Sequence, residues 1–195
     1  MHHIAIFASG DGTNAENIIR YFSHHPQIQV SLVVYNRKEA GVRLRTEAAG
    51  VATVFHPKEA WNDEAATLAL LRRYGIDFIV LSGFLLLIPA YLIRHFEGRI
   101  VNIHPSLIPR HCGRGMYGNR VHEAVLASGD SETGITIHMI DEEYDHGHVV
   151  MQAKCPVLSG DTVEELAARV HALEYRCYPE AIERLLLGLP SNTTC

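Results

Sequence analysis

Residues 101–109 constrain the fold more than any other part of the chain. They continue an apolar, β-branched run typical of a buried strand, and from residue 102 they read Asn-Ile-His-Pro-Ser-Leu-Ile-Pro. Because side chains alternate along a strand, Asn102 and His104 share one face, and Pro105 stops the strand directly after them. We therefore expect an amide and an imidazole at the carboxyl edge of a sheet, where open α/β sheets bind their ligands.

Short apolar runs alternate with segments of helical character through the rest of the first half. The predicted strands are residues 3–8, 27–35, 51–55 and 77–81, and a further strand that the chain enters over residues 98–101 and that Pro105 stops. The predicted helices are residues 15–22, 40–49, 59–74 and 90–96. This alternation indicates right-handed βαβ units, and hence a mostly parallel, twisted sheet flanked by helices.

The second half is predicted to add an edge ribbon and a long helix. Residues 134–140 and 148–153 read as two antiparallel strands around an acidic turn. The helix that follows is expected to be capped by Asp161 together with Glu164, and to bend or restart at Pro179. We expect one domain over residues 1–188 and a loose C-terminal tail over residues 189–195.

Composition argues against several classes of partner. The formal net charge of −5 provides no basic field for nucleic acid, so a small-molecule substrate is expected. The longest apolar stretch, residues 78–91, is interrupted by Gly83 and Pro89 and falls short of the roughly 20 residues of a membrane span. No signal peptide is recognisable and the cysteines show no C-x-x-C spacing, so a cytoplasmic location is expected.

A glycine-rich turn follows the first predicted strand. Residues 9–14 read Ser-Gly-Asp-Gly-Thr-Asn and lead into a helix. Backbone N–H groups at such a turn converge on anions, and Thr13 and Asn14 add side-chain donors, so the turn suits a phosphate. The sequence is neither a dinucleotide fingerprint nor a Walker loop. A tight turn capped by Thr13 or Asn14 without any ligand is the alternative.

Three polar side chains suggest acyl transfer chemistry. Asn102 and His104 could stabilise the negative charge that develops on a carbonyl oxygen, and Asp145 could orient His104 and take part in proton transfer. Spacing alone does not bring Asp145 to His104, and a structural histidine beside a solvated turn aspartate would read the same way. His138, His146 and His148 lack the spacing of a metal site, so no metal is expected.

Several motifs together resemble the folate-dependent formyltransferase family over residues 4–187, and within it the branch that formylates phosphoribosylglycinamide. The motifs are residues 8–14, Ser-Gly-Phe at 82–84, the run at 102–109, Tyr-Asp-His-Gly at 144–147, and Leu-Glu-Tyr at 173–175 ahead of Tyr178 and Pro179. The resemblance implies a single-domain, Rossmann-like formyltransferase fold: a mostly parallel α/β sheet with an antiparallel edge ribbon.

The resemblance also implies an activity. The formyl group of 10-formyltetrahydrofolate, a co-substrate, would pass directly to the amine of 5-phosphoribosylglycinamide (GAR) through a tetrahedral intermediate, in purine biosynthesis. The enzyme would be a monomer or homodimer without a metal. The alternatives are a formyltetrahydrofolate deformylase and a non-catalytic module that binds a phosphate ligand or folate.

The same resemblance assigns residues to roles. The catalytic residues would be Asn102, His104 and Asp145. The substrate-binding residues would be Gly12, Thr13, Asn14, Pro105 and Glu174. The residues that enclose the folate pterin would be Phe84, Leu85, Leu86, Ile88, Val101 and Ile140.

Overall fold

The structure is a computed structural model that describes residues 1–190; residues 191–195, most of the predicted tail, lie outside the described residues. The chain divides into two compact units, Met1–Val101 and the residues from Asn102 onward. The division falls within strand β5 (Ile100–His104). The predicted domain boundary at residue 188 remains a prediction.

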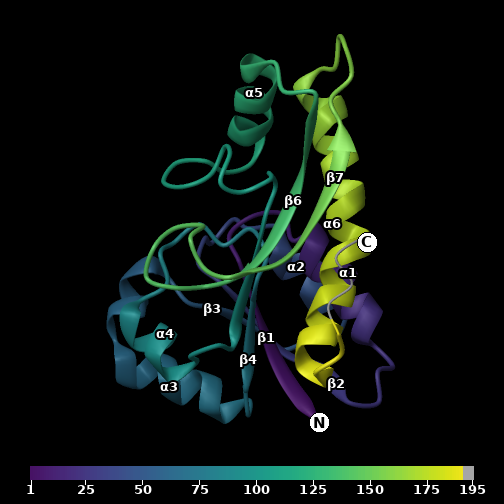
Figure 1. Cartoon of the computed structure of the whole chain (residues 1–195). Helices are drawn as coiled ribbons and strands as arrows, with labels where there is room; N and C mark the ends of the chain where they lie inside the picture. The colour runs from purple at the N-terminus through teal and green to yellow at the C-terminus, as the bar shows by residue number, and fades with distance from the viewer. Residues whose placement is uncertain (191–195) are drawn as a thin grey trace. The chain divides into compact units, whose positions relative to one another are not determined.

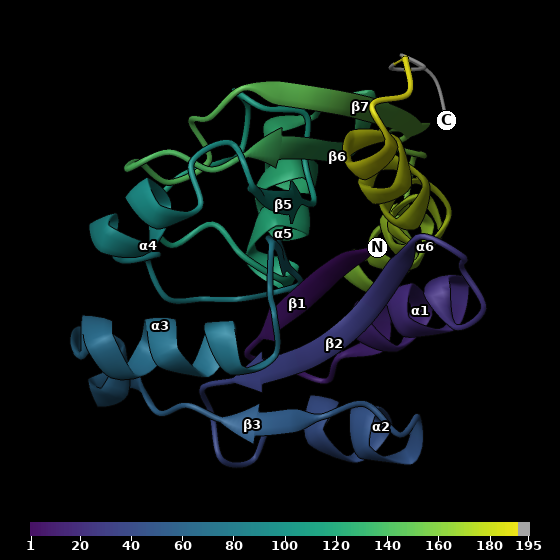
Figure 2. The same ribbon diagram turned by 90° about the horizontal axis from the view of Figure 1, so that it is seen from below.

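The first unit is built on parallel strands. Strand β1 (His2–Ala8) pairs with β2 (Ile28–Tyr35) on one side and with β4 (Phe78–Leu81) on the other, and β2 pairs with β3 (Thr53–Phe55). Figure 2 shows β1, β2 and β3 side by side. The inner strands are almost entirely buried, which explains why their sequences are continuously apolar rather than alternating.

Helices flank these strands. Helix α1 (Thr13–Phe22) packs against α2 (Val42–Ala48), and α3 (Glu64–Arg73) packs against α4 (Ala90–His95). The predicted helix over residues 59–74 is wrong in detail, because a 3-10 turn, η1 (Lys58–Asn62), precedes α3. The break lies at Asp63, whose carboxylate caps α3 by accepting a hydrogen bond from the N–H of Ala66 at 2.9 Å.

The second unit contains the antiparallel ribbon. Strands β6 (Glu132–Met139) and β7 (Val149–Pro156) pair antiparallel, with a register shift between Ile137 and His138. Helix α5 (Asn119–Ser128) packs against the long helix α6 (Val163–Leu187), which also packs against both strands. Figure 1 shows α6, in yellow, beside β7.

The start and continuity of α6 correct two expectations. The capping box lies one residue later than predicted and consists of Thr162 and Glu165. Asp161 instead accepts two hydrogen bonds from Arg169, at 2.7 and 2.9 Å. The helix also does not restart at Pro179, because a single missing N–H is tolerated in a helix held along its length by packing.

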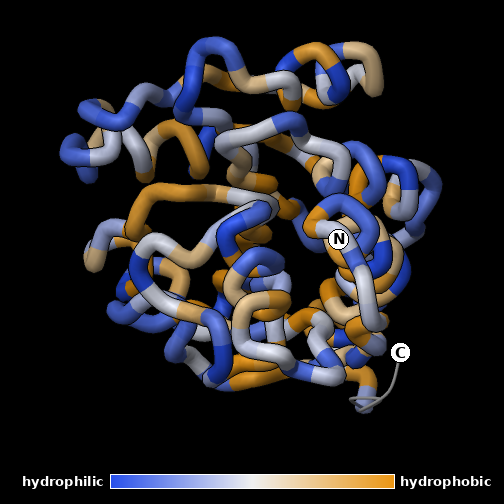
Figure 3. The backbone as a smooth tube through the Cα atoms, turned by 90° about the horizontal axis from the view of Figure 1, so that it is seen from above, coloured by the Kyte–Doolittle hydropathy of each residue, from blue (hydrophilic) through white to orange (hydrophobic). Residues whose placement is uncertain are grey.

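The strand order confirms the predicted fold class. In the first unit the strands follow the order β3-β2-β1-β4 and pair in parallel, and in the second unit β6 and β7 form the antiparallel pair. The backbone trace in Figure 3 shows hydrophobic, orange stretches interspersed with hydrophilic, blue ones along the chain. Within the part of the chain that the structure describes, no helix has the length and apolar character needed to cross a membrane.

Candidate active site

His104 lies at the end of β5 with a defined partner at each ring nitrogen. The residue is 4 % exposed. Its Nε2 lies 2.9 Å from the backbone carbonyl oxygen of His111, and its Nδ1 lies 3.5 Å from Oδ2 of Asp145. Because a carbonyl only accepts hydrogen bonds, Nε2 carries the proton in the neutral ring, and Nδ1 presents a lone pair. The structure thus places Asp145 beside His104, as predicted, although spacing alone did not require it.

Asp145 is held in an unusual backbone conformation. Its φ is 53°, in the left-handed region that residues other than glycine rarely adopt. Oδ2 accepts a hydrogen bond from the N–H of Gly113 at 2.9 Å, and Oδ1 lies 3.7 Å from Nε2 of His138. Burial works against ionisation, but contact with His138 in its protonated form, the charge of a protonated His104 and the hydrogen bond from the Gly113 N–H outweigh it, so the pKa of Asp145 is lowered.

The pKa of His104 is also lowered, for a different reason. Burial disfavours its charged form, and the charge of Asp145 and the hydrogen bond to His111 only partly offset this effect, so its pKa lies below the ordinary 6.5. At neutral pH the pair therefore consists of a neutral imidazole and a carboxylate. An imidazole in this state can accept a proton at Nδ1, beside the carboxylate that would stabilise the resulting charge.

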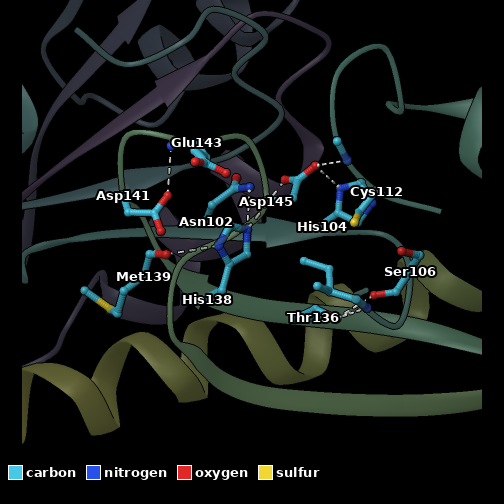
Figure 4. Close-up of polar contacts among 12 residues, drawn as sticks. Asn102, His104, Ser106, Cys112, Thr136, His138, Met139, Asp141, Glu143 and Asp145 are labelled. Carbon is cyan, nitrogen blue, oxygen red and sulfur yellow. Dashed lines mark hydrogen bonds and ion pairs between the residues drawn. The ribbon is translucent and has the colours of Figure 1, made fainter. Parts of the chain in front are cut away.

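His138 orients Asn102, a role that the sequence did not suggest. Nδ1 of His138 lies 3.0 Å from the carbonyl oxygen of Met139 and must donate to it, which leaves Nε2 as an acceptor. Nδ2 of Asn102 lies 3.1 Å from that Nε2 and donates to it, so the orientation of the amide is defined (Figure 4). The sequence pattern that could have pointed to His138 is the spacing of polar residues in an apolar strand, since Thr136 and His138, two residues apart, lie on one face of it.

Buried hydrogen bonds fix the turn after β5. Oγ of Ser106 donates to the carbonyl oxygen of Arg110 at 2.7 Å. Oγ1 of Thr136 donates to the carbonyl oxygen of Ser106 at 2.6 Å and accepts from the N–H of Ile108 at 3.0 Å. Ser106 therefore braces the turn that carries His104 and the half-buried Pro105. A role for Pro105 in binding substrate stays a prediction.

Glu174 is a buried carboxylate on α6. It is 4 % exposed, and its Oε2 lies 2.7 Å from Nδ1 of His171. The hydrogen bond to Glu174 raises the pKa of His171 despite partial burial. An acidic group held in this way can accept hydrogen bonds from hydroxyls or amides, which is the chemistry that its predicted role requires.

In the first unit, the predicted phosphate turn has the geometry of a tight turn. Gly12 is the N-cap of α1 with φ 77°, and it has no side chain with which to cap the helix. A Cβ at Gly12 would overlap the side chain of Val42, so glycine is required there on two counts. Thr13 and Asn14 form the first turn of α1 and are half-buried. The alternative of a cap supplied by Thr13 or Asn14 is therefore not what the structure shows.

The apolar segment predicted to hold the pterin rests on an aromatic cluster. The centroid of the Trp61 ring lies 5.1 Å from the ring centroids of both Phe7 and Phe84, and 4.7 Å from the ring centroid of His56. Trp61 Nε1 donates to the carbonyl oxygen of His56 at 3.0 Å, which fixes the indole. Burial divides the predicted pterin residues: Phe84, Leu85, Leu86 and, in the second unit, Ile140 are half-buried, whereas Ile88 and Val101 are buried.

Among residues 1–190, no group of three or more His, Cys, Asp or Glu side chains is placed to hold a metal ion. Cys112 is also a poor nucleophile. Burial and the charge of Asp145 raise the pKa of its thiol, and its Sγ donates to the carbonyl oxygen of Pro109. The polar cluster around His104 therefore offers an amide donor, an imidazole and a carboxylate.

Comparison with known proteins gives a consistent family. A family model described as formyl transferase matches residues 2–182. The chain is 42 % identical over 191 residues to a chloroplastic phosphoribosylglycinamide formyltransferase of Vigna unguiculata, covering 93 % of this chain and 60 % of the relative. It is 33 % identical over 187 residues to the phosphoribosylglycinamide formyltransferase of Escherichia coli, covering 92 % and 85 %. The chain thus spans less than two thirds of the plant relative.

Solved structures agree with these relatives. Glycinamide ribonucleotide transformylase 1 from Symbiobacterium toebii superposes with a TM-score of 0.88 at 32 % identity, covering 100 % of this chain and 92 % of that one. Phosphoribosylglycinamide formyltransferase from Brucella melitensis superposes with a TM-score of 0.86 at 36 % identity, covering 97 % of each chain.

Proposed function

Because the chain belongs to the formyl transferase family, we propose that it transfers the formyl group of 10-formyltetrahydrofolate to the amine of 5-phosphoribosylglycinamide, as a step of purine biosynthesis. The names of its relatives support phosphoribosylglycinamide as the acceptor, and the folate donor is the one that the resemblance implies. One observation carries the proposal: His104 is buried at the end of β5, and its Nδ1 lies 3.5 Å from Oδ2 of Asp145. This pair can accept a proton where acyl transfer releases one.

The first step is attack of the GAR amine on the formyl carbon. A C–N bond forms, and the carbonyl electron pair moves to oxygen to give a tetrahedral oxyanion. One hydrogen of Asn102 Nδ2 is donated to His138, and the second remains for the oxyanion. A fixed donor of this kind is worth several kcal/mol because it needs no reorganisation during the reaction.

Proton transfer then completes the reaction. The attacking nitrogen, positively charged after attack, loses a proton to Nδ1 of His104. The imidazolium formed is stabilised by Asp145, and its charge offsets that of the oxyanion. When the intermediate collapses, the bond from carbon to the folate nitrogen breaks, and that nitrogen takes up the proton. Formyl-GAR and tetrahydrofolate leave, and the two side chains return to their first state.

The remaining predicted residues complete the proposal. Gly12, Thr13 and Asn14 would bind the phosphate of GAR at the first turn of α1. Glu174 and Pro105 would contact the rest of GAR. The pterin would be enclosed by Phe84, Leu85, Leu86, Ile88, Val101 and Ile140. We also propose a cytoplasmic location and a monomer or homodimer; the plant relatives carry the description chloroplastic.

A spectrophotometric assay tests the function. Purified protein is mixed with the formyl donor, with and without GAR, and loss of the donor is followed. Turnover that requires GAR and yields formyl-GAR supports the transferase. Equal turnover without GAR would instead identify a deformylase, and binding of either ligand without turnover would identify a non-catalytic module.

A further inference from the structure

His111 occupies a position that the proposed reaction does not use directly. Its φ is 51°, and among residues 1–190 the non-glycine residues with positive φ are His111 and Asp145. Both are partners of His104, one at each ring nitrogen. Strained residues persist where the surrounding structure holds them, and they cluster at functional sites.

The ring of His111 is held by an aspartate outside the reacting groups. Nε2 of His111 lies 2.7 Å from Oδ2 of Asp130, in the connection between α5 and β6. The other oxygen of Asp130 accepts a hydrogen bond from Nη1 of Arg110 at 3.1 Å. Because Asp130 lies between two regular elements, this contact ties the segment after β5 to the scaffold of the second unit.

The segment held in this way supplies both groups that define the surroundings of His104. The carbonyl oxygen of His111 accepts the hydrogen bond from Nε2 of His104 at 2.9 Å. Two residues later, the N–H of Gly113 donates to Asp145 at 2.9 Å. Beyond it, Gly115 and Gly118 also have positive φ, so the tether at His111 lies just before a glycine-rich stretch.

We propose that His111 is a positioning residue: its ring, held by Asp130, fixes a left-handed backbone whose carbonyl keeps the His104 proton on Nε2. This proposal rests on the proposed function, in which Nδ1 of His104 accepts the proton of the attacking amine. Without the carbonyl of His111, the ring can instead hold its proton on Nδ1, hydrogen-bonded to Asp145. In that tautomer Nδ1 has no lone pair, and the first proton transfer fails.

Kinetics of matched variants test the tether. His111→Ala removes the ring from a position where a Cβ is strained, and we expect kcat to fall roughly 10- to 100-fold, because small misplacements cost that much. Each KM should stay within about threefold. His111→Gly, which tolerates the left-handed backbone, should lose less than His111→Ala. The matched control is Arg110→Ala, which removes a different partner of Asp130 and should keep kcat within about twofold of the parent.

A double-mutant cycle and the tautomer of His104 provide the decisive readouts. Asp130→Ala should resemble His111→Ala, and the double variant should lose no more kcat than either single variant, because both remove one tether. Nitrogen-15 NMR of the ligand-free protein should show the His104 proton on Nε2, and a shift of population toward Nδ1 in His111→Ala.

Three outcomes would overturn the proposal: an unchanged His104 tautomer in His111→Ala, losses in kcat that multiply in the double variant, or a change confined to KM. Failure of the proposed function would look different, since the parent protein would then show no GAR-dependent turnover. The NMR comparison needs no substrate, so it would still decide whether His111 positions His104.

Discussion

Two histidines lie beside aspartates of the same loop, residues 141–147, yet their pKa values are shifted in opposite directions. Nδ1 of His146 lies 2.7 Å from Oδ2 of Asp141 in an exposed pair, and this hydrogen bond raises the pKa of His146. Nδ1 of His104 lies 3.5 Å from Oδ2 of Asp145 in a buried pair, and burial lowers the pKa of His104 in spite of the carboxylate. An adjacent carboxylate therefore does not by itself make a histidine cationic.

The difference shows what the fold contributes to the chemistry. At the exposed pair, water stabilises both charges and the contact contributes little beyond local order. At the buried pair, the backbone partners at Gly113 and His111 set the distance and the tautomer, and burial keeps the imidazole neutral. The buried pair is therefore a neutral base next to an ionised carboxylate.

Asp145→Asn should abolish most of the turnover. The substitution keeps the size of the side chain but removes the charge that stabilises the His104 imidazolium, and we expect kcat to fall about 10³-fold, within the range of lost proton-transfer groups. The KM for GAR should change little, because the charge acts in the transition state. Steady-state kinetics measure both parameters. Turnover close to the parent level would remove Asp145 from the proton path.

Gly147→Ala should have the next largest effect, through the backbone that carries Asp145. A Cβ at Gly147 would overlap the carbonyl oxygen of Met139 and lie 2.8 Å from its carbonyl carbon. The loop must shift to make room, which moves Asp145 away from His104, and we expect a loss in kcat of roughly 100-fold. A crystal structure of the variant would show the shift, and kcat unchanged despite a displaced Asp145 would contradict the contrast drawn here.

His138→Ala should cost less, because it removes the acceptor that orients Asn102 and leaves the donor in place. Loss of one buried hydrogen bond of about 1.4 kcal/mol corresponds to a loss in kcat of about 10-fold. The exposed His24 offers a matched control, and His24→Ala should leave kcat within about twofold of the parent. Equal losses in the two variants would show that His138 does not act through Asn102.

The titration of the two histidines tests the comparison between the buried and the exposed pair most directly. It also involves the smallest expected change in activity. NMR titration of the ligand-free protein should give His104 a midpoint below 6.5 and His146 a midpoint above it. The pKa of His104 is lower in the folded protein than in the unfolded chain, so its protonation destabilises the fold as the pH falls below about 6.5. The pKa of His146 is raised in the folded protein, so His146 stabilises the fold at low pH, and this contribution is lost as the pH rises through the raised pKa. His146→Ala should keep kcat within about twofold of the parent.

The sequence predicted the elements better than the contacts between them. Continuous apolar runs identify buried parallel strands, and the period of two placed Asn102 and His104 on one face, because both signals are local. The hydrogen bond from Asn102 to His138 joins residues 36 apart, and no local pattern encodes it. The tether from His111 to Asp130 was missed for the same reason. At the start of α6, Thr162 and Asp161 are both good caps by residue type; Thr162 caps the helix, whereas Asp161 pairs with Arg169, eight residues further along the chain.

The packing of Trp61 has a practical consequence. It is the single tryptophan of the sequence and is 4 % exposed, so the intrinsic fluorescence of the protein reports on one buried place. Its indole touches the ring of Phe84, at the start of the segment expected to enclose the pterin. A folate that rearranges this segment should alter the emission of an unlabelled sample. Donor affinity could then be titrated optically in variants too slow for any turnover assay.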